Sequence, residues 1–136
     1  MAGYSGTPLA KKLGLEDGMR AYLVGVPDDL APMFATLNVT PKLAPSIVKE
    51  LDYIHVFSTD ADAVAKTLPK LAKALADTGM LWLSWPKKAS KRPTTLDETG
   101  ARSLGLASGL VDVKVCAVDE VWSGLKFMRR LVDRAK

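Results

Sequence analysis

The chain has 136 residues, of which 48% are hydrophobic and 25% charged. This length and composition suit a single folded domain over residues 1–136 and exclude collagen-like, disulfide-scaffold and disordered chains. The formal net charge of +4 is uneven, because residues 1–68 hold six basic and eight acidic side chains whereas residues 69–136 hold thirteen basic and seven acidic ones.

The first third of the chain predicts two short elements and one clear strand. A helical stretch over residues 9–13 ends at Gly14, and an apolar strand follows over residues 19–26. Prolines restrict residues 38–50 to a short edge strand. Between these strands, apolar side chains recur at helical spacing and predict a further helix. They are Leu30, Met33, Phe34 and Leu37.

A second strand and a long helix are predicted next. Residues 51–57 are dense in aromatic and β-branched side chains, which is typical of a buried strand. Thr59 and Asp62 have the spacing of a capping box, so the helix begins there. Pro69 lies deep inside this helix and predicts a kink or a break, and Gly79 predicts its end.

The second half begins with a third strand over residues 80–85 and a basic loop over residues 87–92. A helix is predicted from about residue 96 to residue 104, since Thr94 and Thr95 stand at capping-box spacing from Asp97 and Glu98. The chain then closes with a hairpin. Its strands are expected at 112–118 and 123–130, joined by a short connection.

Alternating strands and helices predict parallel strands with right-handed crossovers. The expected fold is a three-layer, Rossmann-like α/β domain with a mostly parallel sheet of five or six strands, which ends in an antiparallel β-hairpin. A sheet of this kind resembles the class I methyltransferase variant of the Rossmann fold in a shortened form. Residues 4–14, 85–90 and 109–127 also resemble an uncharacterised family of small bacterial proteins. That resemblance implies the fold but no activity and no functional residues.

Counting excludes several chemistries. Cys116 is the only cysteine and His55 the only histidine, so the chain has no internal disulfide and too few ligands for a Cys/His zinc site. Both lie in apolar runs and are expected as buried structural side chains rather than as a catalytic pair. The N-terminus does not read as a signal peptide, and no apolar run approaches the ~18 residues that span a membrane. A soluble, cytoplasmic protein without a membrane partner is expected.

The turn after the first strand does not have the residues of an ordinary nucleotide-cofactor site. A dinucleotide or S-adenosylmethionine site needs a glycine-rich turn and an acidic side chain about 20 residues later. The turn here has Gly25 alone, Pro27 removes a backbone donor, and Asp28 and Asp29 would repel a pyrophosphate. No cofactor is expected, and a degenerate methyltransferase-like enzyme or nucleotide binder is kept as the alternative.

The carboxyl edge of the sheet is where an open α/β sheet binds ligands. The third strand and the hairpin turn bring lysines, carboxylates and tryptophans there, which predicts a site for an anionic small ligand or partner, without catalysis. The lysines would neutralise a phosphate or carboxylate, a tryptophan would stack on a planar group, and a carboxylate would hold a hydroxyl or act as a base. These residues are Trp85, Lys87, Lys88, Asp119, Glu120 and Trp122.

Two further basic features need an interpretation. Lys114 sits within an apolar strand, so it is expected to be buried with a partner, either Asp112 on the same side or Asp119 or Glu120 in the turn. The C-terminal region is also basic, which leaves a nucleic-acid accessory role open, although no nucleic-acid-binding motif is present. Self-association of the chain is a further possibility. The basic side chains of this region are Lys126, Arg129, Arg130, Arg134 and Lys136.

Overall fold

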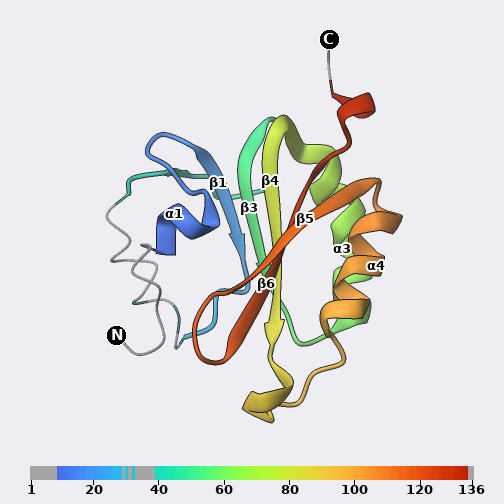
Figure 1. The fold of residues 1–136 in the computed structure, drawn as a ribbon. Helices are drawn as coiled ribbons and strands as arrows, with labels where there is room; N and C mark the ends of the chain where they lie inside the picture. Colours follow the sequence, from blue (N-terminus) through green and yellow to red (C-terminus); the bar gives the residue numbers. More distant parts are fainter. Residues whose placement is uncertain (1–8, 29, 31, 33–38, 135–136) are drawn as a thin grey trace.

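A computed structural model describes residues 9–28, 30, 32 and 39–134, and Figure 1 shows its fold. Its centre is a six-stranded sheet in the order β2-β1-β3-β4-β6-β5. The pairs among β1, β2, β3 and β4 are parallel, whereas β6 runs antiparallel to both β4 and β5. The strands are β1 Arg20–Val24, β2 Lys42–Leu43, β3 Leu51–Phe57, β4 Leu75–Pro86, β5 Leu110–Ala117 and β6 Trp122–Arg129. The predicted mixed sheet with a terminal hairpin is confirmed.

Aspartates begin both long helices. Asp60 accepts hydrogen bonds from the backbone N–H groups of Asp62 and Ala63, one residue beyond the predicted Thr59 cap, and Asp97 accepts one from Gly100 N–H. A carboxylate satisfies N–H groups that have no partner within a helix. The helices are α1 Leu9–Leu13, α3 Ala61–Ala74, η1 Lys88–Ser90, α4 Glu98–Ala107 and η2 Leu131–Asp133. The helix predicted around Leu30 falls largely outside the described residues.

Helix α3 runs through Pro69 without a break, so the predicted break is wrong. A proline inside a helix costs about 3 kcal/mol, and the apolar face of α3, which is fully buried at Leu68 and Leu71, offsets this cost. The helix ends at Ala74 rather than at Gly79. Leu75 already pairs with Leu51, and the pairing resumes only at Met80, so the residues between form an irregularity in β4.

Apolar side chains cover both faces of the sheet, which gives the three layers seen in Figure 1. Helices α3 and α4 pack on one face, called here the α4 face, and α1 packs on the other, called the α1 face. The core on the α4 face includes Ile54, Leu68, Leu81, Leu83, Trp85, Leu125 and Phe127. The core on the α1 face includes Leu13, Tyr53, Phe57, Trp82, Val118 and Trp122.

Both edges of the sheet have local causes. β2 is the short edge strand that Pro41 and Pro45 predicted, and it pairs only with β1. β5 forms the other edge, and an irregularity lies between Asp112 and Lys114, where Asp112 pairs with Phe127 and Lys114 with Lys126. Val113 is therefore an extra residue. A bulge of this kind reverses the alternation of side chains, so that neighbouring charges point to opposite faces.

Candidate functional site

A pocket of about 440 Å³ lies at the carboxyl end of β4 on the α4 face. One side is built by the end of β4 and the start of η1, and the other by the segment that leads into α4. It is called here the β4–α4 pocket. Its lining residues are Trp85, Pro86, Lys87, Lys88, Thr94, Thr95, Leu96, Asp97, Glu98, Thr99 and Ser123. The sequence placed the ligand site at this edge, and three of the candidate residues line the pocket: Trp85, Lys87 and Lys88.

The lysine side of the pocket is held by the hairpin turn. Lys87 N–H donates to the Val121 carbonyl at 2.7 Å, and its ammonium Nζ donates to the Asp119 carbonyl at 2.9 Å. Ser90 Oγ donates to the Lys87 carbonyl at 2.7 Å. The basic loop is thus an ordered 3₁₀ turn fixed to the rim of the sheet. Lys88 is exposed at its start.

The opposite side is tied to the end of β3. Thr95 N–H donates to the Thr59 carbonyl at 2.9 Å, and Thr95 Oγ1 accepts from Ala61 N–H at the same distance. Thr94 Oγ1 accepts from Leu96 N–H at 3.0 Å, while the Leu96 side chain is fully buried. These bonds use the threonine hydroxyls for structure. The sequence predicts both threonines only as part of a cap and gives no sign of their place in the pocket.

Charges of both signs face the pocket in equal number. Lys87 and Lys88 supply two positive charges, and Asp97 and Glu98 supply two negative ones. Glu98 also accepts from Arg102 at 3.1 Å in an exposed pair, so its charge is partly compensated outside the pocket. A simple anion site would have an excess of positive charge. The pocket therefore suits a polar ligand that carries a negative group at one end and a hydrogen-bond donor or positive group at the other.

The other candidate residues of the hairpin lie outside the lining. Asp119 Oδ1 accepts from the N–H groups of Val121 and Trp122 at 2.8 and 2.7 Å, which shapes the turn. Glu120 is exposed. Trp122 is buried on the α1 face, where its ring meets Phe57 edge-on at 5.7 Å, and its indole Nε1 has no partner among the described residues.

Lys114 differs from its prediction. It is exposed rather than buried, because β5 is an edge strand. The bulge at Val113 places it on the α1 face opposite Lys126, whereas Asp112 faces α4 and accepts from Arg102 at 3.0 Å. That bond lowers the pKa of Asp112. No carboxylate of the described residues pairs with Lys114, so the expected structural ion pair is wrong.

His55 and Cys116 do not form a catalytic pair. His55 is fully buried, with Nδ1 2.9 Å from Tyr53 Oη and Nε2 2.7 Å from Ser84 Oγ, and burial lowers its pKa to about 3. The expected burial of His55 is confirmed. Cys116 is only half-buried on the edge strand, contrary to the expectation, and this burial still raises its thiol pKa.

The turn after β1 keeps one feature of a close-packed ligand turn. Gly25 has a φ of +68°, and a Cβ at this position would lie 2.6 Å from the Phe57 carbonyl oxygen. Only glycine fits there. The turn otherwise lacks the glycines of a cofactor fingerprint, and the later acidic residue, Glu50, precedes β3 rather than ending β2.

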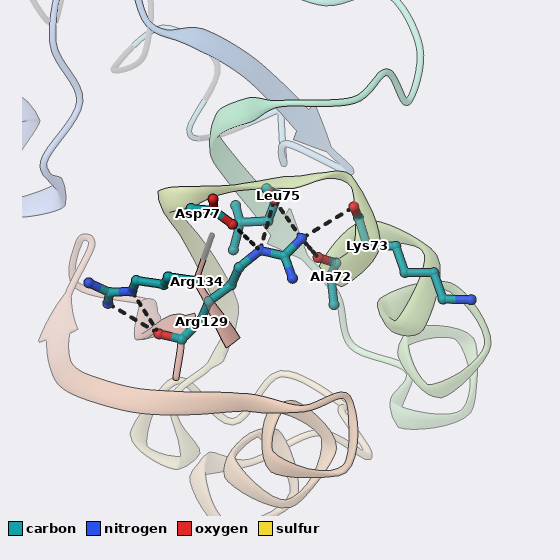
Figure 2. Close-up of polar contacts among 6 residues, drawn as sticks. All are labelled: Ala72, Lys73, Leu75, Asp77, Arg129 and Arg134. Carbon is teal, nitrogen blue, oxygen red and sulfur yellow. Dashed lines mark hydrogen bonds and ion pairs between the residues drawn. The ribbon is translucent and has the colours of Figure 1, made fainter. Parts of the chain in front are cut away.

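The basic C-terminal residues are largely engaged within the chain. Figure 2 shows Arg129 reaching from β6 to the end of α3. Its guanidinium donates to the carbonyls of Ala72, Lys73 and Leu75 at 2.6–3.3 Å. Arg130 pairs with Asp133 at 2.9 Å, and Arg134 donates to the Arg129 carbonyl. These contacts favour a structural role over a free cationic tail.

Neither a metal centre nor a membrane-spanning helix is found in the part of the chain that the structure describes. Within residues 9–28, 30, 32 and 39–134, no group of three His, Cys, Asp or Glu side chains is placed to hold a metal ion. No helix of this part has the length and hydrophobicity to cross a membrane.

Comparison with solved structures shows a methyltransferase-like fold. A SAM dependent methyltransferase from Aquifex aeolicus matches with a TM-score of 0.70 and 16% identity over 90% of this chain and 88% of that one. The magnesium protoporphyrin IX methyltransferase of Synechocystis PCC 6803 with bound SAH gives 0.58 and 11% over 90% and 78%. A chain from the complex of the Trm112 methyltransferase activator with the putative methyltransferase of Haloferax volcanii gives 0.62 and 9% over 88% and 86%.

At sequence identities this low, the similarity to these structures shows the fold alone. No family model matches the chain, and no curated protein matches it. The six-stranded sheet, in which the antiparallel strand β6 lies between β4 and the edge strand β5, is therefore the methyltransferase-like variant of the Rossmann fold. This confirms the predicted fold class. Fold by itself does not fix chemistry.

Proposed function

We propose that this chain is a methyltransferase-like protein that binds a small polar ligand in the β4–α4 pocket. The observation that carries the proposal is the position of this pocket at the carboxyl edge of the sheet, where open α/β sheets bind their ligands. One of the solved structures with this fold is described with bound SAH, which supports ligand binding by a protein of this fold.

The charges of the pocket define the class of ligand. The exposed ammonium of Lys88 meets a carboxylate or phosphate group, while Asp97 and Glu98 on the other side meet an amine or hydroxyl. Trp85, only 5% exposed, supplies an apolar surface at the base of the pocket. An amino acid or a phosphorylated amino sugar has this combination. Such a zwitterionic ligand extends the anionic ligand that the sequence predicts.

The experiment is a calorimetric screen of the full chain with amino acids, phosphorylated metabolites, nucleotides and S-adenosylmethionine. Lys88→Gln should weaken binding of the hit at least about tenfold, since a charge-assisted bond is lost. Lys91→Gln is the matched control, because Lys91 lies in the same turn but outside the lining. A ligand that binds Lys88→Gln as tightly as the original protein would place the site elsewhere.

The second candidate is binding of S-adenosylmethionine at the turn after β1, followed by methyl transfer. The fold of the compared methyltransferases and the close approach of Gly25 to β3 favour it. The single glycine and the position of Glu50 before β3 argue against it. S-adenosylmethionine binding that Lys88→Gln leaves intact and that a change in the turn after β1 removes would support this candidate over the first.

Three predictions from the sequence remain open. A nucleic-acid accessory role requires salt-dependent binding to polynucleotides, which a filter-binding titration checks. Self-association requires a mass above that of one chain in solution. A cytoplasmic location is proposed from the sequence alone.

A further inference from the structure

Three lysines gather on the α1 face, on the side of the sheet opposite the β4–α4 pocket. Lys114 of β5 and Lys126 of β6 are direct cross-strand partners. Lys12 of α1 reaches the same hairpin, where its Nζ donates to the Ala117 carbonyl at 3.4 Å. The group is called here the lysine cluster.

No carboxylate of the described residues forms an ion pair with any member of the cluster. The ion pairs of the second half of the chain lie on the α4 face or near the C-terminus. Like charges directly opposite each other on neighbouring strands destabilise a sheet. Burial, and then the neighbouring Lys114, lower the pKa of Lys126.

The cluster also has a defined shape. Lys126 is also the cross-strand partner of Trp82 in β4. Its Nζ lies beside Gly14, 3.9 Å from the position that a Cβ on this glycine would take. Its ammonium is therefore half-buried between α1 and the sheet. Cys116 is half-buried next to Lys12 and Lys114.

We propose that the lysine cluster binds a phosphate group. Uncompensated charges held close together are a local conflict, and such conflicts in folded proteins mark functional sites. A phosphate carries up to two negative charges and several acceptor oxygens, so it can bridge three ammonium groups. The group belongs to a small phosphorylated ligand or to the backbone of a single-stranded nucleic acid. This site is independent of the proposed function, because it lies on the other face of the sheet.

Pyrophosphate is the first probe. The full chain is titrated with it by calorimetry, at an ionic strength held constant with sodium chloride. The double variant Lys114→Gln/Lys126→Gln should bind at least about tenfold more weakly, since two charge-assisted contacts are lost. The double variant Lys66→Gln/Lys70→Gln, which removes the same charge from exposed positions of α3, is the matched control and should bind as the original protein does. Without ligand, the double variant should be at least as stable as the original chain, because a repulsion has been removed.

A fluorescent single-stranded oligonucleotide is the second probe and distinguishes the source of the phosphate. Pyrophosphate binding without oligonucleotide binding assigns the site to a small ligand. Oligonucleotide binding that weakens with salt and is lost in the double variant assigns it to a nucleic-acid backbone. The proposal is overturned if neither probe binds, or if the folded double variant binds both as tightly as the original chain.

Discussion

The imidazole Nε2 of His55 lies 2.7 Å from the Ser84 hydroxyl, across the pair of buried strands β3 and β4. The other ring nitrogen lies 2.9 Å from the Tyr53 hydroxyl, and the ring stacks on Phe57 with the centroids 4.1 Å apart. The only histidine of the chain is thus a neutral part of the core, and its protonation is coupled to folding.

We expect the stability of the protein to fall as the pH drops below about 6.5. The folded pKa of His55 is about 3, well below the ordinary histidine value of 6.5, because burial disfavours the charged ring. Between these values the unfolded chain binds a proton that the folded chain does not. The free energy of unfolding should therefore decrease by up to about 1.4 kcal/mol per pH unit over this window.

Urea unfolding at a series of pH values from 7.5 to about 4.5 checks this expectation. The carboxylates of the chain titrate near the lower end, so the comparison is with His55→Gln, which has no imidazole. The difference in unfolding free energy between the two proteins should shrink as the pH falls. Parallel curves would mean that His55 is not coupled to folding.

Removal of Arg129 should destabilise the chain. Its guanidinium satisfies carbonyl groups at the C-terminus of α3, as Figure 2 shows, and Arg129→Met leaves them without this donor. A hydrogen bond to a charged group is worth about 1.5–3 kcal/mol, so a loss of about 2–3 kcal/mol of unfolding free energy is expected. Arg130→Met is the control, because Arg130 makes only an exposed pair with Asp133 and should cost less than about 1 kcal/mol.

Gly25→Ala should be more harmful than Gly18→Ala. Both glycines have a positive φ, but only at Gly25 would the new methyl group meet the backbone, at 2.6 Å from the Phe57 carbonyl oxygen. The conformational cost of about 1–2 kcal/mol is common to both, and the clash adds about 1–3 kcal/mol at Gly25 alone. Thermal unfolding measures the difference. Equal losses would show that the turn after β1 relaxes away from β3.

Cys116 should react slowly with a thiol reagent. Burial raises its pKa, while Lys12 and Lys114 lower it in part. Since the thiolate is the reactive form, modification near pH 7.5 should be slower in the folded protein than in the chain unfolded by urea. Lys114→Gln should slow it further. A faster reaction in the variant would indicate that access, rather than charge, controls the rate.

The regular elements were predictable because their signals are local. The strand 51–57 was predicted at its observed bounds from its apolar run, and Pro41 and Pro45 limited β2 to an edge. The end of α3 was missed, since its partner Arg129 lies 54 residues from Leu75 in the sequence. Nothing local predicts such a contact.

The location of some candidate residues could be predicted for the same reason. Trp85 lies at the end of the predicted third strand, and Lys87 and Lys88 follow it, so their place at the carboxyl edge could be inferred. The Thr94–Thr99 side reaches the pocket through tertiary bonds to Thr59 that the sequence does not show. The face on which Lys114 lies depends on one extra residue in β5. The alternation of side chains along a strand does not predict such a bulge.

The bulge at Val113 determines which face of the hairpin carries each of two neighbouring charges. Asp112 and Lys114 are two positions apart in the sequence, yet they face opposite layers. Only a regular strand in which Val113 is paired, rather than extra, would turn the lysine toward α4, on the side of Arg102 and away from Lys126. A shift of register by one residue, which keeps every charge in the chain, would then exchange one electrostatic environment for another.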